Sequence, residues 1–350
     1  MSYSYLKNLV SQLGEAKPKG KALTAIEIPD INSSIEFIDV SSFDFRALNL
    51  LPCEVKPWND EERATIRLFF DKLGVTVPGL LALAVIGRRI KLIRTTALVF
   101  SDGKRPCALA GENTIILSDN FFSAPNALHS FAHELTHVAD DAYFVAFSKE
   151  WIELAEPLMK QYRDGNGTID KTLFFQTKWP SEYACENLVE ALAEYVACYA
   201  TGKYFDSVEL FERTIAPLIV NPDTTIMQWK KTVSKAREAR DKRNIELARR
   251  EFEQACKLFP AKPFPYLQMA GIAASSADYK KTIFYTTKMI DSFKIIRSSS
   301  PIELDYIYLI LRTFATASLP EKTREFAMWL LREYPDHTEI CKYCYEKSEQ

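Results

Sequence analysis

The sequence predicts a mostly helical α+β fold in two parts, an α+β domain with a small sheet and a metal site, followed by an all-α domain of helical repeats. Three observations lead to this prediction. Two histidines stand four residues apart in a helical stretch, strand-like segments precede that stretch, and a helical pattern recurs toward the C-terminus. A length of 350 residues favours two or three domains.

Composition argues against several classes of partner. The 44 basic and 46 acidic residues give a net charge of −2, which offers no electrostatic reason to bind nucleic acid or an acidic membrane surface. No apolar run is long enough to span a membrane, and no signal peptide is evident. The seven cysteines are scattered and odd in number, which is typical of free thiols in a reducing compartment. We therefore expect a cytoplasmic protein, although a secreted effector would have the same composition.

The first segment, residues 1–57, mixes extended and turn signals and is interrupted by prolines, which predicts an arm or cap. Asn59 is followed by acidic residues and an amphipathic pattern, so a helix is expected over 60–73. A second helix is expected over 78–87. These two helices open the α+β domain, which is predicted to cover residues 58–225.

Two strands are expected next. Residues 91–100 are rich in β-branched side chains, and residues 101–106 have the composition of a turn. A second short run of β-branched residues covers 114–117. The predicted sheet therefore directly precedes the histidines in the sequence.

The histidine pair lies in the sequence His-Glu-Leu-Thr-His at residues 133–137. On a helix, His133 and His137 share one face and can bind one metal ion. Glu134 lies beside them, where its carboxylate can take a proton from water at the metal. Apolar residues at helical spacing indicate that the rest of this helix is buried. The alternative is a surface helix with two ordinary histidines.

A catalytic zinc site needs a third protein ligand and one open position. Glu186, Glu190 and Glu194 are each four residues apart in a helical run over 181–199, where they form one acidic stripe. Leucine and alanine residues cover the other faces of this helix, so the aligned carboxylates need a positive partner. With this spacing, one carboxylate can bind the metal while the next accepts a hydrogen bond from a ligand imidazole.

These two segments, residues 133–141 and 183–195, resemble the peptidase domain of anthrax lethal factor and its relatives, within the thermolysin-like (gluzincin) zinc peptidases. The resemblance covers roughly residues 90–205. It implies a zincin-like fold, a bound Zn²⁺ ion and hydrolysis of peptide bonds. The zinc ligands that it implies are His133, His137 and Glu190. The toxin-specific domains of that family have no counterpart here, so its biological role does not carry over.

The resemblance also implies roles for other residues. Glu134 would be the general base, and Glu194 would orient a ligand histidine. Tyr183 corresponds to a tyrosine that stabilises the transition-state oxyanion or protonates the leaving amine. In such peptidases an extended substrate pairs with the edge strand before the active helix, and residues 113–117 are the candidate. An ordinary interior strand is the alternative for this segment.

Three neighbours of the histidine pair are less informative. His129 lies four residues before His133. A fourth imidazole would close the open coordination position, so His129 is expected to pack or to line the pocket. Asp140 and Asp141 follow His137 by one turn and are either partners of a ligand imidazole or surface charges.

The cysteines suggest no second site. Cys341 and Cys344 have the spacing of a redox or metal pair, but no second pair accompanies them, so the spacing is expected to be incidental. Cys185 and Cys198 flank the acidic stripe and are expected to be small core residues.

Further helices are expected over 149–163, kinked or broken at Pro157, and over 205–219. Residues 230–250 are dense in Lys and Arg but interleaved with acidic residues, which predicts a solvated helix and not a nucleic-acid patch.

The domain predicted over 226–350 contains an internal repeat. One set of residues recurs at the same offsets 75 positions later, and a middle copy lies around residues 266–283. The two sets are Ala248, Phe252, Ala255 and Pro260, and then Thr323, Ala327, Leu330 and Pro335. The pattern resembles tetratricopeptide repeats, which implies a concave surface for a protein partner. A plain helical bundle is the alternative.

Together these patterns predict a zinc-dependent endopeptidase that acts on a protein or peptide substrate. The alternative is a regulatory or binding protein whose repeats recruit a partner, while the metal domain is latent or acts as a sensor. Intact ligands and an intact base favour the enzyme.

Overall fold

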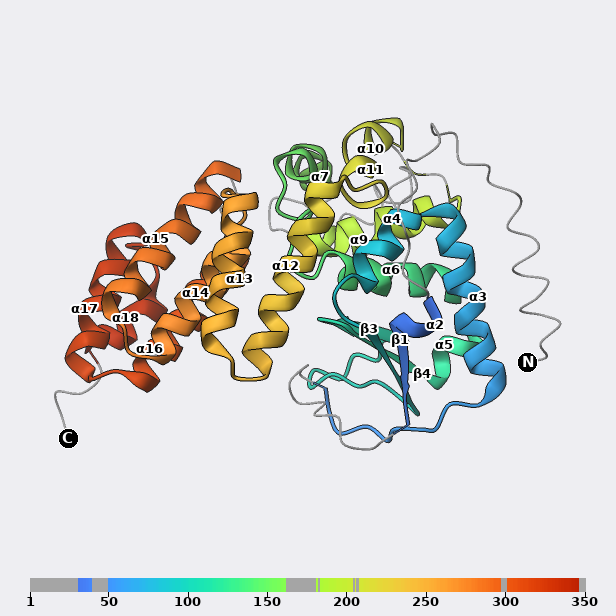
Figure 1. The fold of residues 1–350 in the computed structure, drawn as a ribbon, viewed down its shortest axis with the longest axis horizontal. Helices are drawn as coiled ribbons and strands as arrows, with labels where there is room; N and C mark the ends of the chain where they lie inside the picture. The colour runs from blue at the N-terminus through green and yellow to red at the C-terminus, as the bar shows by residue number, and fades with distance from the viewer. Residues whose placement is uncertain are drawn as a thin grey trace. The chain divides into compact units, whose positions relative to one another are not determined.

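The computed structural model describes residues 31–39, 50–161, 181, 183–203, 205, 208–296 and 301–345. The chain divides into two compact units, Met1–Lys230 and Lys231–Gln350. The predicted fold class is confirmed at the level of a mostly helical α+β fold with a small sheet (Figure 1). Within the described residues, none of the helices is both long and apolar enough for a membrane span.

The sheet of the first unit has four strands in the order β1-β2-β4-β3. Its strands are β1 (Ile35–Ile38), β2 (Ile90–Thr95), β3 (Ala108–Gly111) and β4 (Thr114–Ser118). The first three strands of this order run parallel, whereas β3 pairs antiparallel with β4. A tight turn joins β3 to β4, and Glu112 in this turn has a φ of 52°. Strand β1 shows that part of the predicted arm contributes to the sheet.

The sheet corrects two sequence predictions. The predicted strand over 91–100 ends at Thr95, and Phe100 makes only an isolated bridge to Leu50. The segment 113–117 is not the sheet edge, because β4 lies between β2 and β3 and all of its residues are buried. The edges are β1 and β3, and β3 is the one that packs against α6. Its sequence Ala-Leu-Ala-Gly lacks the β-branched residues that mark strands.

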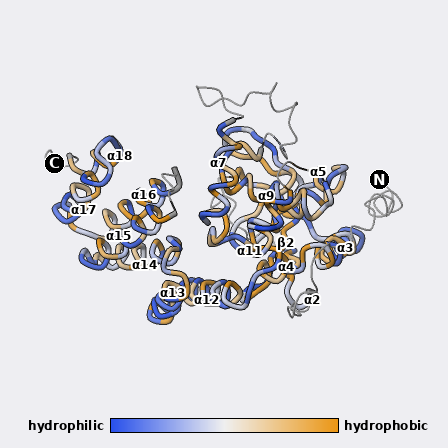
Figure 2. The backbone as a smooth tube through the Cα atoms, turned by 90° about the horizontal axis from the view of Figure 1, so that it is seen from above, coloured by the Kyte–Doolittle hydropathy of each residue, from blue (hydrophilic) through white to orange (hydrophobic). Residues whose placement is uncertain are grey.

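Several helices of the first unit pack against α6 (Ala127–Ala139), the helix that carries the histidine pair. Helix α3 (Asp60–Thr76) begins with a capping box at Asn59, and α4 (Pro78–Val85) is hydrophobic along its whole length (Figure 2). Helix α6 packs against α4, β3 and α9. The remaining short helices before it are α2 (Ile31–Ser34) and α5 (Asp119–Ser123).

Aromatic packing fixes α6 on the side of α3. The ring of Phe131 on α6 lies 5.8 Å from Phe69 and 5.1 Å from Phe70 on α3, measured between centroids. It also lies 6.4 Å from the ring of Phe121 on α5. Such pairs add to the burial free energy of the rings, so α6 has one rigid face. The predicted burial of this helix is confirmed, since Phe131, Leu135 and Val138 are all buried.

The helices after α6 do not have the bounds that the sequence predicts. Helix α7 (Lys149–Gln161) continues through Pro157, so the helix is not broken there. The helix predicted over 205–219 is two helices, α10 (Val208–Thr214) and α11 (Ala216–Ile219), because Pro217 cannot supply a backbone N–H within a continuous helix. The turn η2 (Tyr183–Cys185) precedes α9 (Leu188–Ala200). Within the stretch predicted as one helix over 181–199, the helix itself therefore begins only after Asn187.

The division between the units falls within α12 (Thr224–Asp241). The segment 230–250 is not one helix, because the chain turns at Arg243, whose φ is 59°, and restarts at Asn244. The Asn244 side chain accepts from the Leu247 N–H and caps the next helix. The helices that follow are α13 (Ile245–Leu258), α14 (Pro263–Ser275), α15 (Tyr279–Ile296), α16 (Pro301–Ala317), α17 (Pro320–Glu333) and α18 (Thr338–Tyr345).

The recurring positions of the sequence are buried in every second helix of this unit. Helices α13, α15 and α17, here called the repeat helices, bury residues at the same three offsets. These residues are Ala248, Phe252 and Ala255, then Thr282, Thr286 and Met289, then Thr323, Ala327 and Leu330. Helix α14 packs against α13, α15 and α16, so neighbouring helices bury these faces together.

Candidate metal centre

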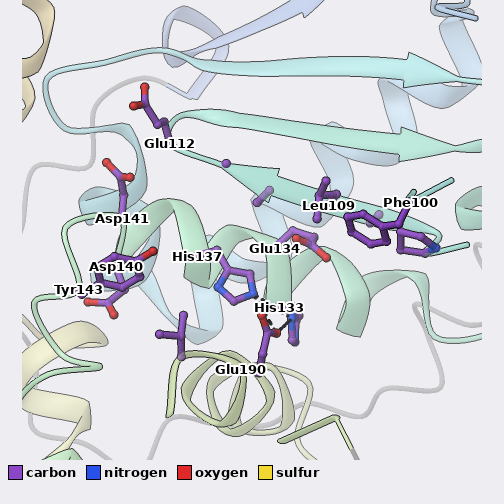
Figure 3. Close-up of a pocket in the computed structure, with 15 residues that line it drawn as sticks. Phe100, Leu109, Glu112, His133, Glu134, His137, Asp140, Asp141, Tyr143 and Glu190 are labelled. Carbon is purple, nitrogen blue, oxygen red and sulfur yellow. Dashed lines mark hydrogen bonds and ion pairs between the residues drawn. The ribbon is translucent and has the colours of Figure 1, made fainter. Parts of the chain in front are cut away.

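Helices α6 and α9 bring two histidines and a glutamate together. In Figure 3, α6 lies between the sheet and α9, and His133, His137 and Glu190 converge in the space between the two helices. Within the described part of the chain, these three residues form the one group of histidine, cysteine and acidic side chains whose ligand atoms lie close enough to hold a metal ion. His133 is buried, and the other two are partly buried.

The three ligand atoms form a compact triangle. His133 Nε2 lies 3.1 Å from Glu190 Oε2 and 3.0 Å from His137 Nε2. The third side, from His137 Nε2 to Glu190 Oε2, is 3.3 Å. Tetrahedral zinc, with bonds of about 2.0–2.1 Å, separates its ligand atoms by roughly 3.3 Å. The donor set and its spacing therefore fit a tetrahedral ion with one open position.

Glu194 holds His133 from the opposite side. The Nδ1 atom of His133 lies 2.9 Å from Glu194 Oε1, in a buried environment. An ionised carboxylate only accepts hydrogen bonds, so Nδ1 carries a proton and Nε2 is the nitrogen left for an ion. This is the arrangement that a metal ligand needs. Without an ion Nε2 donates to Glu190, and although burial lowers the pKa of His133, its bonds to Glu190 and Glu194 raise it to about 10.

The electrostatics of the group favour a cation. Burial raises the pKa of Glu190, but its hydrogen bonds with His133 and His137 outweigh burial and lower it. For Glu194, burial also raises the pKa, and hydrogen bonds from His129 and His133 lower it well below its usual range. Both carboxylates therefore remain negative between the helices, where positive charge compensates their burial.

His129 is the partner that sequence reasoning missed. Its Nε2 lies 3.4 Å from Glu194 Oε2, so it binds the second oxygen of the same carboxylate. The prediction of packing or pocket lining is incomplete, because the side chain makes a buried polar contact across the helices. The four-residue spacing from His133 to both His129 and His137 was the available signal.

Glu134 lines a pocket of about 210 Å³ together with His133, His137 and Glu190 (Figure 3). The edge strand β3 forms another wall of this pocket. Burial raises the pKa of Glu134, while the nearby His133 and His137 and a hydrogen bond with the Ala110 backbone lower it, and the net effect is a raised pKa. A carboxylate with a raised pKa is a stronger base, which suits a residue that accepts a proton from water.

The start of α9 is fixed so that Glu190 faces α6. The Asn187 side chain accepts from the N–H groups of Val189 and Glu190, and Trp151 Nε1 donates to the Leu188 carbonyl at 2.8 Å. The predicted stripe is shortened at its beginning, because Glu186 precedes the helix and is exposed. Glu190 and Glu194 keep the four-residue spacing on one helix.

Asp140 acts on the backbone after α6. Its buried carboxylate accepts from the N–H of Val145 at 2.7 Å and of Ala146 at 3.0 Å. The buried Lys230 donates to the Val138 carbonyl at 3.1 Å, at the same end of the helix. These contacts anchor the end of the helix that carries His137.

Asp141 and the four cysteines singled out in the sequence are not part of the ligand triangle. The Tyr183 side chain lies outside the described residues, although its backbone belongs to η2. Asp141 lines the pocket of Glu134. Cys185 and Cys198 are buried free thiols, as expected of core residues, and Cys341 and Cys344 lie on α18 as free thiols.

No protein-family model, curated protein or solved structure matches this chain. Its geometry defines the class of site: two imidazoles and a carboxylate from two packed helices, with a further carboxylate in the same pocket. This group can hold a metal ion.

Proposed function

We propose that the chain is a zinc-dependent endopeptidase of the gluzincin type, in which a zincin-like domain binds Zn²⁺ through His133, His137 and Glu190. One observation carries the proposal. The ligand triangle and the candidate base Glu134 line a single pocket, and the base is adjacent in sequence to the first ligand. Two imidazoles, one carboxylate and an open position are the donor set of catalytic zinc.

The chain's own residues have distinct roles in this reaction. A bound zinc ion would act as a Lewis acid and lower the pKa of water in the pocket. Glu134 accepts a proton from the attacking water, whose oxygen adds to the scissile carbonyl carbon. Glu134 then delivers that proton to the amine nitrogen as the carbon–nitrogen bond breaks. Tyr183 remains the predicted donor to the oxyanion.

We further propose that the substrate lies along β3. In the antiparallel pairing of β3 with β4, Ser118 N–H donates to the Cys107 carbonyl, so the residues that bond to β4 alternate from Cys107. Ala108 and Ala110 therefore direct their backbone groups to the edge away from β4, where the Ala110 backbone makes a hydrogen bond with Glu134. An extended peptide can pair there through main-chain hydrogen bonds, whatever its side chains.

The second unit is proposed to be a tetratricopeptide-like repeat domain that recruits a protein partner. The supporting observation is the burial of the same three offsets in α13, α15 and α17. The small residues of these helices allow close packing between neighbours.

The test combines zinc content with peptide hydrolysis in four proteins. Purified wild-type protein should hold about one zinc ion per chain after dialysis and should cleave a protein substrate such as casein. Glu134→Gln should retain the ion but lose activity by at least about 10²-fold, because the base is gone. Glu190→Gln should lose zinc affinity by more than about 10-fold.

Glu186→Gln is the matched control, because this carboxylate belongs to the predicted stripe but is exposed and precedes α9. It should leave zinc content and hydrolysis unchanged. A wild-type protein that binds no zinc when supplied with it, or a Glu134→Gln variant as active as wild type, would overturn the proposal.

A further inference from the structure

Two imidazoles share the carboxylate of Glu194. His133 Nδ1 lies 2.9 Å from Oε1, and His129 Nε2 lies 3.4 Å from Oε2. His129 and Glu194 are each only 8% exposed, so water contributes little to this arrangement. Both oxygens of one buried carboxylate are therefore held by histidines that stand one turn apart on α6.

The proton positions on His129 follow from its partner. Because an ionised carboxylate only accepts, the ring nitrogen that faces Glu194 must be the donor, and this is Nε2. The other ring nitrogen, Nδ1, is buried without a hydrogen-bond partner among the described residues. As an acceptor without a proton, Nδ1 is the less costly of the two nitrogens to leave unpaired. Among the described residues, the one hydrogen bond of this ring is therefore to Glu194.

This bond determines how freely Glu194 can turn. A carboxylate held by a single donor can rotate about its last torsion, whereas donors to both oxygens fix its plane. The plane of Glu194 sets the direction of the bond to His133 Nδ1, and that bond sets the orientation of the ring that faces Glu190 and His137. Loss of the His129 bond would also leave Oε2 buried and unpaired, which is costly for a charged group.

We propose that His129 is a positioning residue of the metal centre, which fixes the Glu194 carboxylate so that His133 presents Nε2 to the ion. The proposal rests on the proposed zinc site. His129 acts through two intervening side chains and is not itself a ligand, because its Nε2 is directed to Glu194 and it stands outside the ligand triangle.

The experiment compares two substitutions of His129 whose side-chain amides differ in length. The side-chain nitrogen of glutamine is as many bonds from Cα as His Nε2, and that of asparagine is as many as His Nδ1. His129→Gln can therefore still donate to Glu194, while His129→Asn carries the same amide and cannot reach it. The full-length wild-type protein and both variants are titrated with zinc against a chelator, and the ¹⁵N shifts of His133 in the zinc-loaded protein report which of its ring nitrogens binds the ion.

Zinc affinity should stay within a few-fold of wild type in His129→Gln and fall about 10–100-fold in His129→Asn, as for other partners of metal-ligating histidines. In the zinc-loaded protein His133 should bind the ion through Nε2 and keep a proton on Nδ1 in wild type and His129→Gln, and this form should be mixed with others in His129→Asn. Equal affinities in all three proteins, or equal losses in both variants, would overturn the positioning role alone. A wild-type protein that binds no zinc would overturn this role and the proposed function together.

Discussion

Buried polar side chains are used differently in the metal-site helices and in the repeat helices. In the first unit, His129 and His133 on α6 bond to Glu194 on α9, so each contact crosses between helices. In the second unit, Thr282 and Thr286 on α15 donate to carbonyl oxygens four residues back, those of Asp278 just before the helix and of Thr282 within it. All of these side chains are buried, but only the first set depends on where a neighbouring helix lies.

The two kinds of hydrogen bond constrain helix packing differently. A hydroxyl that bonds its own helix is satisfied locally and specifies nothing about packing. A charged group that bonds across two helices is satisfied in only one register, and it is costly in any other. The bonds of His129 and His133 to Glu194 therefore contribute to the placement of α6 on α9, whereas the hydroxyls of Thr282 and Thr286 leave the placement of α15 to other contacts, such as apolar burial.

The largest expected effect in the repeat unit comes from its apolar core. Phe252 on α13 is fully buried at one of the repeated offsets. Phe252→Ala should lower the free energy of unfolding of this unit by about 3–5 kcal/mol, through lost burial and the cavity that remains. Hydrogen exchange of peptides from α13 and α14 measures the loss, because the two units need not unfold in one transition.

Phe284→Ala is the control, since Phe284 on α15 is 54% exposed. It should change the free energy of unfolding by less than about 1 kcal/mol. Equal effects of the two substitutions would contradict apolar burial at the repeated offsets as the source of stability.

Lys230 is an intermediate case, a buried charge that bonds across helices but to a neutral carbonyl. Burial lowers its pKa from 10.5 to about 8, although Asp140 opposes this shift. Between these two pH values the unfolded state binds more protons than the folded state, so the wild-type free energy of unfolding rises with pH. A shift of this size corresponds to roughly 3 kcal/mol.

Lys230→Met should therefore be more stable than wild type at pH 7, by about 1–3 kcal/mol after the lost bond to Val138 is subtracted. This advantage should shrink as the pH rises from about 8 toward 10.5. Urea unfolding of the first unit at several pH values measures it. Lys231→Met is the control, because Lys231 follows on α12 and is exposed. Parallel pH profiles for wild type and Lys230→Met would contradict the lowered pKa.

The sequence was most informative where one helix carries a whole pattern. His133 and His137 are four residues apart on α6, and Glu190 and Glu194 are four apart on α9. Residues at this spacing share one face of a helix, so each pair lies on one face as predicted. The fold class followed from the same periodicity. Helix ends were less predictable, because the restart at Asn244 depends on a single cap within a charged run.

What the sequence did not contain is which elements meet. Strand β3 has a composition that marks no strand, and it becomes the sheet edge only through its pairing with β4. The role of His129 depends on Glu194, which lies 65 residues away. Likewise, Lys230 reaches α6 across 92 residues of sequence. Such contacts are set by tertiary packing. The spacing of residues within one helix or strand does not show which other element it will pack against.

The smallest expected effect comes from the threonine hydroxyls of the repeat helix α15, which bond to carbonyl oxygens four residues back. The Thr282 hydroxyl donates to the Asp278 carbonyl at 2.8 Å, and the same carbonyl also accepts from the Thr282 N–H at 2.9 Å. Thr282→Val keeps the shape of the side chain and leaves this carbonyl bonded, so the free energy of unfolding of the repeat unit should change by less than about 1 kcal/mol.

Thr286→Val provides a second instance, because its hydroxyl donates to the Thr282 carbonyl in the same way. Urea unfolding of the second unit measures both variants. A loss above about 2 kcal/mol in either one would show that a partner on another helix depends on the hydroxyl, since loss of a bond within the helix costs less. The repeat helices would then rely on polar contacts between helices, as α6 and α9 do. A hydrogen bond within the same helix would no longer explain why threonine can be buried at these offsets.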